Sequence, residues 1–119
     1  MSEIVCLVAS IEEFRALADG TARCWWTVDV LDGRAVQTIY AEAPSREGGF
    51  VVFRYKRVLN PRVLRNLERM HGVRFGGGFE ERVFNACCFL FTEFLQELKI
   101  LGVKACRGRY FLGLRPLLV

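Results

Sequence analysis

An Asp-Gly pair at Asp32 and Gly33 separates two runs of strand-forming residues, and it constrains the fold of this chain more than any other feature. Residues 23–31 and 34–41 are rich in β-branched and aromatic side chains, as strands are. Asp-Gly is among the strongest local signals for a two-residue hairpin turn, and such a turn fixes the register of its strands. The predicted opposite pairs are Val30 with Ala35, Val28 with Gln37, Trp26 with Ile39 and Trp25 with Tyr40.

This register separates the two adjacent tryptophans, because successive side chains of a strand point to opposite faces. Trp26 is expected on the buried face of the hairpin with Val28, Val30 and Ile39. Trp25 and Tyr40 fall on the other face, which is otherwise mostly polar. The remaining side chains of that face are Arg23, Thr27, Asp29, Arg34 and Thr38. The two rings are therefore either exposed and available for binding or covered by a second layer.

Residues 48–57 predict a third strand in which aromatic, β-branched and basic residues alternate. One side carries Phe50, Val52, Arg54 and Lys56, whereas Val51, Phe53 and Tyr55 on the other side have the composition of a core face. A ring beside two cations suits single-stranded nucleic acid, because bases stack on rings and phosphates need positive charge. The simpler alternative is a half-buried strand whose polar face is basic. Arg57 lies on the opposite side of the strand unless a twist at the strand end reorients it.

Capping residues delimit the predicted helices. Ser10 is expected to cap a helix in which Glu13 reaches back and which Gly20 ends. Asn60 and Pro61 start a second helix, which ends at Gly72. A strand over residues 3–9, a long apolar helix over 79–101 and a final strand within 103–114 complete the chain. We predict a single α+β domain over residues 1–119, with an antiparallel sheet containing a β-hairpin meander packed against two to three helices.

The long helix and the C-terminal tail favour self-association. Apolar residues of the helix cover more than one stripe, and residues 116–119 are also apolar. One small domain is not expected to cover both surfaces. We therefore expect a homodimer or higher oligomer, with a symmetric dimer as the simplest form.

Charge and cysteine content narrow the possible partners. The chain has 17 Lys and Arg against 13 Asp and Glu, a formal charge of +4 and a pI near 9.0, which permits anionic partners without requiring them. Five cysteines with one histidine and no C-x-x-C pair leave too few ligands for a zinc site, so we expect neither a metal nor another cofactor. The absence of a leader pattern and of a membrane-length apolar run predicts a soluble cytoplasmic protein without a membrane partner. The excess of arginine over lysine is compatible with a thermophilic source. Because intracellular proteins of hyperthermophiles can contain disulfides, a disulfide among Cys6, Cys24 and Cys106 stays possible.

Residues suited to catalysis are not grouped in a recognised spacing. The glycines at 76–78 enter a helix, but no Gly-Lys-Ser/Thr follows, and Glu80 and Glu81 would repel a phosphate. His71 has no Ser or Cys nucleophile placed with it. A metal-dependent nuclease needs two acids and a lysine at one metal, and no acid precedes Lys56 at the adjacent alternate position. We therefore expect no enzymatic activity, and a nuclease is the third alternative.

The third strand resembles the RNP1 element of RNA-recognition domains at Gly49, Phe50 and Tyr55, but it departs from that element at Gly48 and Val52. Over residues 23–101 the chain is more similar to the ThermoDBP-related proteins of hyperthermophilic archaea. This resemblance rests on Trp25-Trp26, the Asp32-Gly33 hairpin, the strand at 50–57 and the long apolar helix. It implies a small archaeal α+β domain that binds single-stranded DNA or RNA through a cleft of basic and aromatic residues. The heptad-repeat extension of the founding member is missing here, so assembly through a zipper is not implied.

The residues and the resemblance together predict a non-catalytic protein that binds single-stranded DNA or RNA largely independently of sequence. The proposed stacking rings are Trp25, Tyr40 and Phe50. The proposed phosphate contacts are Arg23, Arg34, Arg54, Lys56 and Arg57. The alternative is a protein-interaction or assembly subunit whose exposed aromatic side chains belong to an interface.

Overall fold

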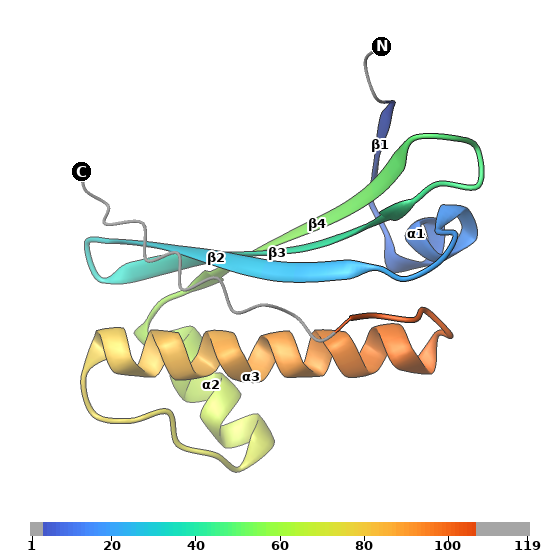
Figure 1. Ribbon diagram of the computed structural model, residues 1–119. Helices are drawn as coiled ribbons and strands as arrows, with labels where there is room; N and C mark the ends of the chain where they lie inside the picture. Colours follow the sequence, from blue (N-terminus) through green and yellow to red (C-terminus); the bar gives the residue numbers. More distant parts are fainter. Residues whose placement is uncertain (1–3, 107–119) are drawn as a thin grey trace.

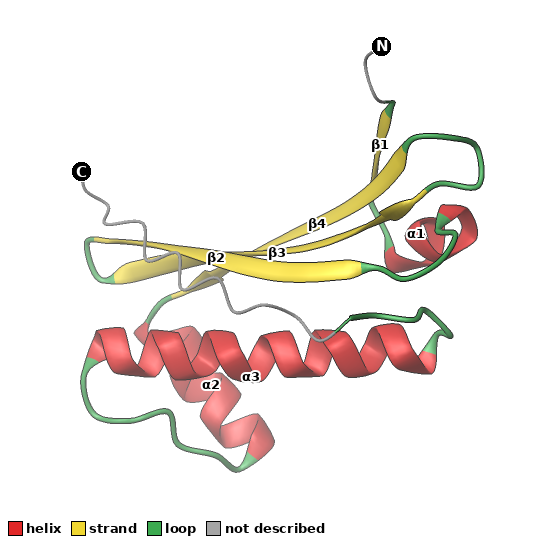
Figure 2. Cartoon of the chain, viewed as in Figure 1, coloured by secondary structure: helices red, strands yellow, loops and turns green. Residues whose placement is uncertain are grey.

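The computed structural model describes residues 4–106. Its elements are β1 (Val5–Val8), α1 (Ile11–Leu17), β2 (Arg23–Leu31), β3 (Arg34–Pro44), β4 (Phe50–Leu59), α2 (Pro61–His71) and α3 (Phe79–Ile100). The sheet forms one layer, and α2 and α3 form a second layer against one of its faces (Figure 1, Figure 2). We call the face toward α3 the inner face and the opposite face the outer face. The predicted α+β class is confirmed.

The four strands form one sheet in the order β1-β4-β3-β2. β2, β3 and β4 are the predicted antiparallel meander. β1 pairs with β4 in parallel, so the sheet is mixed and the prediction of an antiparallel sheet is wrong for this strand. Parallel pairing needs a long connection, and the chain between β1 and β4, with α1 and the hairpin, provides it.

The hairpin forms in the predicted register. Asp32 and Gly33 both have positive φ, at 49° and 74°, as a type I′ turn requires. All four predicted cross-strand pairs occur. The pairing places Trp26, which is 1% exposed, on the inner face and Trp25 on the outer face. Val30, expected in the buried face, is only partly buried at the margin of the core.

The helix caps are confirmed at both predicted starts. The Ser10 hydroxyl accepts a hydrogen bond from the Glu13 N–H at 3.1 Å, and the Asn60 side-chain oxygen accepts one from the Val63 N–H at 2.8 Å. Gly72 ends α2 in the left-handed conformation, as predicted. α1 ends earlier than predicted, with its C-cap at Ala18 rather than at Gly20, because the Ala18 N–H closes the last turn onto Phe14.

The core lies between the inner face and α3. The buried side chains of α3 are Val83, Ala86, Cys87, Leu90, Phe91, Phe94 and Leu98. Phe94 stacks on Phe53 of β4 with ring centroids 5.9 Å apart, and Phe84 contacts Trp26 with centroids 6.1 Å apart. The sheet of the same chain therefore covers much of the apolar surface of α3, which removes the main reason for expecting self-association through this helix.

The end of the described chain returns to the sheet beside β2. Ala22 and Ala105 form a parallel bridge, and the Cys106 N–H donates to the Ala22 carbonyl at 2.9 Å. The predicted final strand within 103–114 lies mostly outside the described residues, as does the apolar tail at 116–119.

Candidate nucleic-acid interface

The outer face of the sheet carries most of the predicted site residues. No described helix covers this face (Figure 1). On β3, Tyr40 lies directly opposite Trp25 of β2 and Arg54 of β4. Two residues away on β3, Thr38 lies opposite Lys56. The register thus gathers two rings and two cations, and we call Trp25, Tyr40, Arg54 and Lys56 the outer-face cluster.

The two rings of this cluster stack on each other. The centroids of Trp25 and Tyr40 are 5.1 Å apart, and the ring planes differ by 10°. This separation is close to the spacing of about 4.7–4.9 Å between neighbouring strands. The rings therefore project from the sheet side by side, and each covers one face of the other. Both side chains are half-buried, and their mutual stacking makes the pair an upright stack rather than a flat platform.

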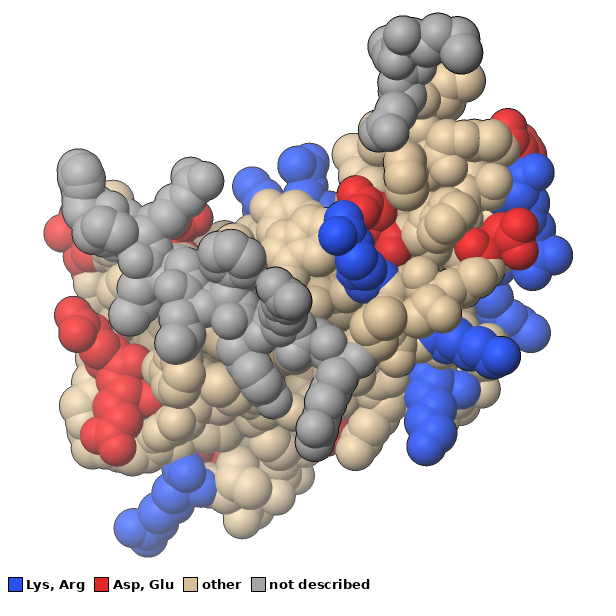
Figure 3. All heavy atoms as spheres, viewed as in Figure 1, with Lys and Arg blue, Asp and Glu red and all other residues tan. Residues whose placement is uncertain are grey.

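The two cations of the cluster are exposed and follow one another on β4. Arg54 and Lys56 are alternate residues of the strand, so their side chains share the outer face. Among residues 4–106, neither forms an ion pair or a side-chain hydrogen bond. Basic side chains rise above the sheet in Figure 3. Their charges are therefore free to meet an anion that lies beside the aromatic stack.

Arg23 lies on the same face but is already paired. Its Nη2 donates to Glu42 Oε1 at 2.6 Å, and this contact raises the pKa of the Arg23 guanidinium. The Glu42 carboxylate offsets the positive charge, which weakens Arg23 as a phosphate contact. Glu42 is not among the predicted site residues, although extending the hairpin register to the first residue of β2 places Glu42 directly opposite Arg23.

Arg34 and Phe50 are not close to the cluster. Arg34 begins β3 and lies six residues from Tyr40, which is roughly 20 Å along an extended strand. Phe50 begins β4 and is half-buried between Val5 of β1 and Pro44 of β3 in the register. Four residues separate it from Arg54, or about 13 Å of strand. The three proposed stacking rings therefore do not form one continuous surface.

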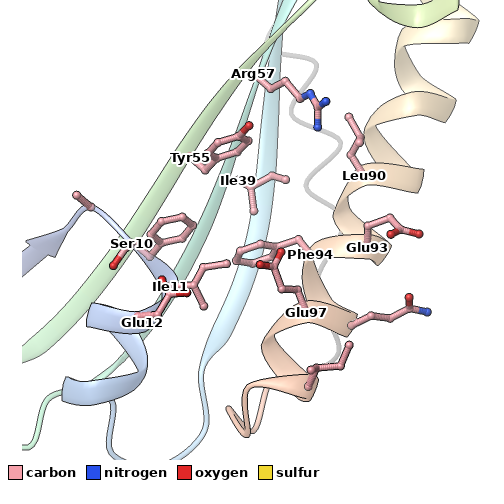
Figure 4. Close-up of a pocket in the computed structure, with 14 residues that line it drawn as sticks. Ser10, Ile11, Glu12, Ile39, Tyr55, Arg57, Leu90, Glu93, Phe94 and Glu97 are labelled. Atoms are coloured by element: carbon pink, nitrogen blue, oxygen red, sulfur yellow. The ribbon is translucent and has the colours of Figure 1, made fainter. Parts of the chain in front are cut away.

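Arg57 lies on the inner face, as its strand position indicates, and so it does not join the phosphate contacts. It lines a cleft of about 660 Å³ between β4 and α3. In Figure 4, Arg57 and Tyr55 project from β4 toward α3, and Phe94 lies on the α3 side of the cleft. Tyr55 is 46% exposed, so its assignment to the core is wrong. The α3 helix leaves this part of the inner face open, which the strand pattern does not reveal.

The lining of this cleft is more acidic than basic. Glu93 and Glu97 come from α3 and Glu12 from α1, whereas Arg57 is the one cation that residues 4–106 contribute to the lining. An excess of carboxylates repels a polyanion. Of the two surfaces, the outer face is therefore the better match to nucleic acid.

The cysteines of the described chain are free thiols, and two of them are buried in the core. Burial raises the pKa of the Cys24 thiol to about 12, and burial also raises the pKa of Cys87. A thiol must ionise to act as a nucleophile or as a metal ligand. Cys24 and Cys87 therefore serve as small apolar side chains of the core.

Metal ligands and membrane-spanning helices are not found in the part of the chain that the structure describes. Between residues 4 and 106, no three His, Cys, Asp or Glu side chains gather closely enough to hold a metal ion. No helix in that range combines the length and the apolar character needed to cross a membrane.

No protein-family model, curated protein or solved structure matches the chain.

Proposed function

We propose that this protein binds single-stranded nucleic acid on the outer face of its sheet, without catalysis. The proposal rests on one observation. Trp25, Tyr40 and Arg54 form a row across three strands, and Lys56 lies two residues from Arg54 on the same face of β4. Rings and unpaired cations in one place match the two parts of a nucleotide, because the base stacks and the phosphate is anionic.

The geometry suggests how one nucleotide lies on this surface. In this binding mode a base stacks against Trp25 or Tyr40 and extends the aromatic pair, while the backbone crosses Arg54 and Lys56 on β4. Stacking on a ring is possible for every base, so the preference among sequences is weak. A duplex keeps its bases stacked on each other, so it cannot use the rings and binds less tightly.

The remaining predicted residues have smaller roles in this proposal. Arg23 is offset by Glu42, and Arg34 and Phe50 contact only a strand long enough to reach them along the sheet. Binding therefore strengthens with strand length until both ends of β3 are covered.

Fluorescence anisotropy with labelled single-stranded DNA, single-stranded RNA and duplex DNA of equal length tests this function. We expect both single strands to bind more tightly than the duplex, and we expect affinity to fall as salt rises. The double variant Trp25→Ala/Tyr40→Ala removes the aromatic stack. It should bind single strands at least tenfold more weakly, since stacking contributes about 1–3 kcal/mol per base. The matched control is Trp25→Phe, which retains a ring. Tighter binding of duplex than of single strands would overturn the proposal.

Assembly through β1 is the second candidate function, and the exposure of this strand favours it. β1 is at the edge of the sheet, and Ile4, Val5 and Leu7 are 69%, 59% and 58% exposed. An uncharged edge strand that lacks proline offers unpaired backbone groups to another strand. A second copy of this chain fits this edge, because identical strands without charge pair antiparallel about a two-fold axis.

Sedimentation velocity at tens of micromolar tests this assembly. A dimer that Leu7→Lys converts to a monomer would support pairing through β1, and oxidative cross-linking through Cys6 of each copy would locate the contact. Ile100→Lys, at the exposed end of α3, is the control for added charge. A parent protein that sediments as a monomer would exclude this candidate.

A further inference from the structure

A basic pocket lies at the opposite end of α3 from α2, apart from the outer face. It measures about 420 Å³ and is lined by Arg15 of α1, Arg46 of the β3–β4 loop and Lys104 after α3. The backbone of Gly20 and Gly102 contributes to its walls. Basic side chains gather at this end of the molecule, near α1 and the end of α3, in Figure 3.

Backbone hydrogen bonds hold the three basic segments together. The Arg46 N–H donates to the Leu17 carbonyl at 2.8 Å, which ties the β3–β4 loop to the end of α1. The Ala22 N–H donates to the Lys104 carbonyl at 2.8 Å, which ties the segment after α3 to the start of β2. The short stretch at 17–22 thus bonds to both other segments. These bonds fix the backbone positions of the three segments, while the side chains of Arg15, Arg46 and Lys104 are exposed.

The positive charges of this pocket lack acidic partners. No Asp or Glu is among its lining residues, and none of the three cations forms an ion pair within residues 4–106. Arg46 donates through Nε to the Ala18 carbonyl at 3.1 Å, which positions the guanidinium and leaves its two terminal nitrogens without a partner among the described residues. Like charges repel, so their convergence without a carboxylate favours an anion between them.

The Lys104 side chain is not needed to cap the ends of the nearby helices. Backbone N–H groups already serve the last turn of α3, since Leu101 donates to Glu97, Gly102 to Lys99 and Val103 to Leu98. The Ala18 N–H likewise donates to the Phe14 carbonyl at the end of α1. Of the three cations, only Arg46 forms a side-chain bond to a helix-end carbonyl within the described part of the chain.

We propose that this pocket binds a phosphate group. A phosphate has several acceptor oxygens and up to two negative charges, and it accepts hydrogen bonds from two guanidinium groups and an ammonium group at once. The phosphate is either free in solution or the terminal monoester of a nucleic-acid strand. The site is separate from the outer-face cluster, so it stands whether or not the proposed function is correct.

Thermal unfolding in sodium phosphate, compared with sodium chloride at equal ionic strength and pH, tests this site. We expect phosphate to raise the melting temperature by roughly 6 °C at ten times its Kd. The double variant Arg15→Ala/Lys104→Ala should melt at the parent temperature in chloride and should lose the response to phosphate. Its matched control is Arg62→Ala/Arg65→Ala on α2, which removes the same charge elsewhere and should keep the response. A response that is absent in the parent protein, or that survives in the Arg15/Lys104 variant, would overturn the site.

The source of the phosphate is distinguished with two oligonucleotides that differ only in a 5′-phosphate. Tighter binding of the phosphorylated strand, by threefold or more and only with Arg15 and Lys104 present, identifies the end of a strand as the ligand. Equal binding of the two strands, together with stabilisation by inorganic phosphate, identifies free phosphate. A failure of the nucleic-acid proposal would remove the binding of the unphosphorylated oligonucleotide but leave the response to inorganic phosphate.

Discussion

Trp25 and Tyr40, on neighbouring strands, stack with their ring centroids 5.1 Å apart and their planes within 10° of each other. Trp25 is the member of the pair on β2, and Tyr40 is the member next to β4, where Arg54 lies opposite Tyr40. The Tyr40 side of the stack is therefore next to Arg54, a cation unpaired among the described residues, whereas Arg23 on the Trp25 strand is paired with Glu42. This asymmetry gives the proposed binding mode a direction across the sheet.

The two adjacent tryptophans are expected to respond differently to truncation. Trp26→Ala should lower the free energy of unfolding by about 3–5 kcal/mol, because it removes a buried core ring. Trp25→Ala should cost only about 0.5–1.5 kcal/mol, the contribution of one aromatic pair, and should weaken nucleic-acid binding. Urea unfolding measures the change in stability, and a separate anisotropy titration measures the change in nucleic-acid binding. Equal destabilisation by the two changes would mean that Trp25 is a core residue.

The cations on β4 are expected to control the salt dependence of binding. Arg54→Ala/Lys56→Ala should reduce the slope of log K against log salt by about 1.4, or about 0.7 for each phosphate contact on a single strand. Trp25→Ala should weaken binding without changing this slope, because a ring releases no counterions. Titrations at four salt concentrations give the slopes, with Arg62→Ala/Arg65→Ala as the control for total charge. An unchanged slope in the β4 double variant would exclude these two contacts.

Acid is expected to weaken the loop between α2 and α3 through Glu68. Glu68 accepts hydrogen bonds from the Phe75 N–H at 2.9 Å and from Arg82 at 3.0 Å, and the Phe75 N–H is the main reason why the pKa of Glu68 is lowered from 4.5. Because the folded pKa is below the unfolded one, this stabilisation is complete above about pH 5 and declines as the pH falls through the folded value. Glu68→Gln should therefore melt below the parent at pH 6, and the difference should shrink toward pH 3. A difference that is constant over this range would contradict the role of the carboxylate charge.

The cysteines are expected to react with a thiol reagent in the order of their exposure. Cys6 and Cys106 are exposed and should react first. Cys88 is half-buried, and burial raises its pKa, so it should react more slowly. Cys24, with a pKa of about 12, and the buried Cys87 should react only after unfolding. Mass spectrometry of partially labelled native protein identifies the modified residues, and early labelling of Cys24 would contradict the described core.

The features that the sequence determined by itself depend on neighbouring residues. The φ preference of Asp32-Gly33 fixed the hairpin, and the hairpin fixed which tryptophan faces the core. Ser10 and Asn60 set two helix starts through hydrogen bonds that span three residues. The pairing of Trp25 with Tyr40 followed from the same register, so the aromatic part of the candidate site could be predicted from local chemistry alone.

The tertiary structure decided everything that depends on where distant segments meet. The four residues of β1 are compatible with either direction and either edge of the sheet, and packing selected a parallel pairing with β4. The path of α3 buried Gln37, whose Nε2 donates to the Cys87 carbonyl at 3.0 Å, and left Tyr55 half exposed on the same face. Arg15, Arg46 and Lys104 meet only because backbone bonds join three segments. Such contacts depend on the free energy of packing the whole chain, which no local pattern of residues contains.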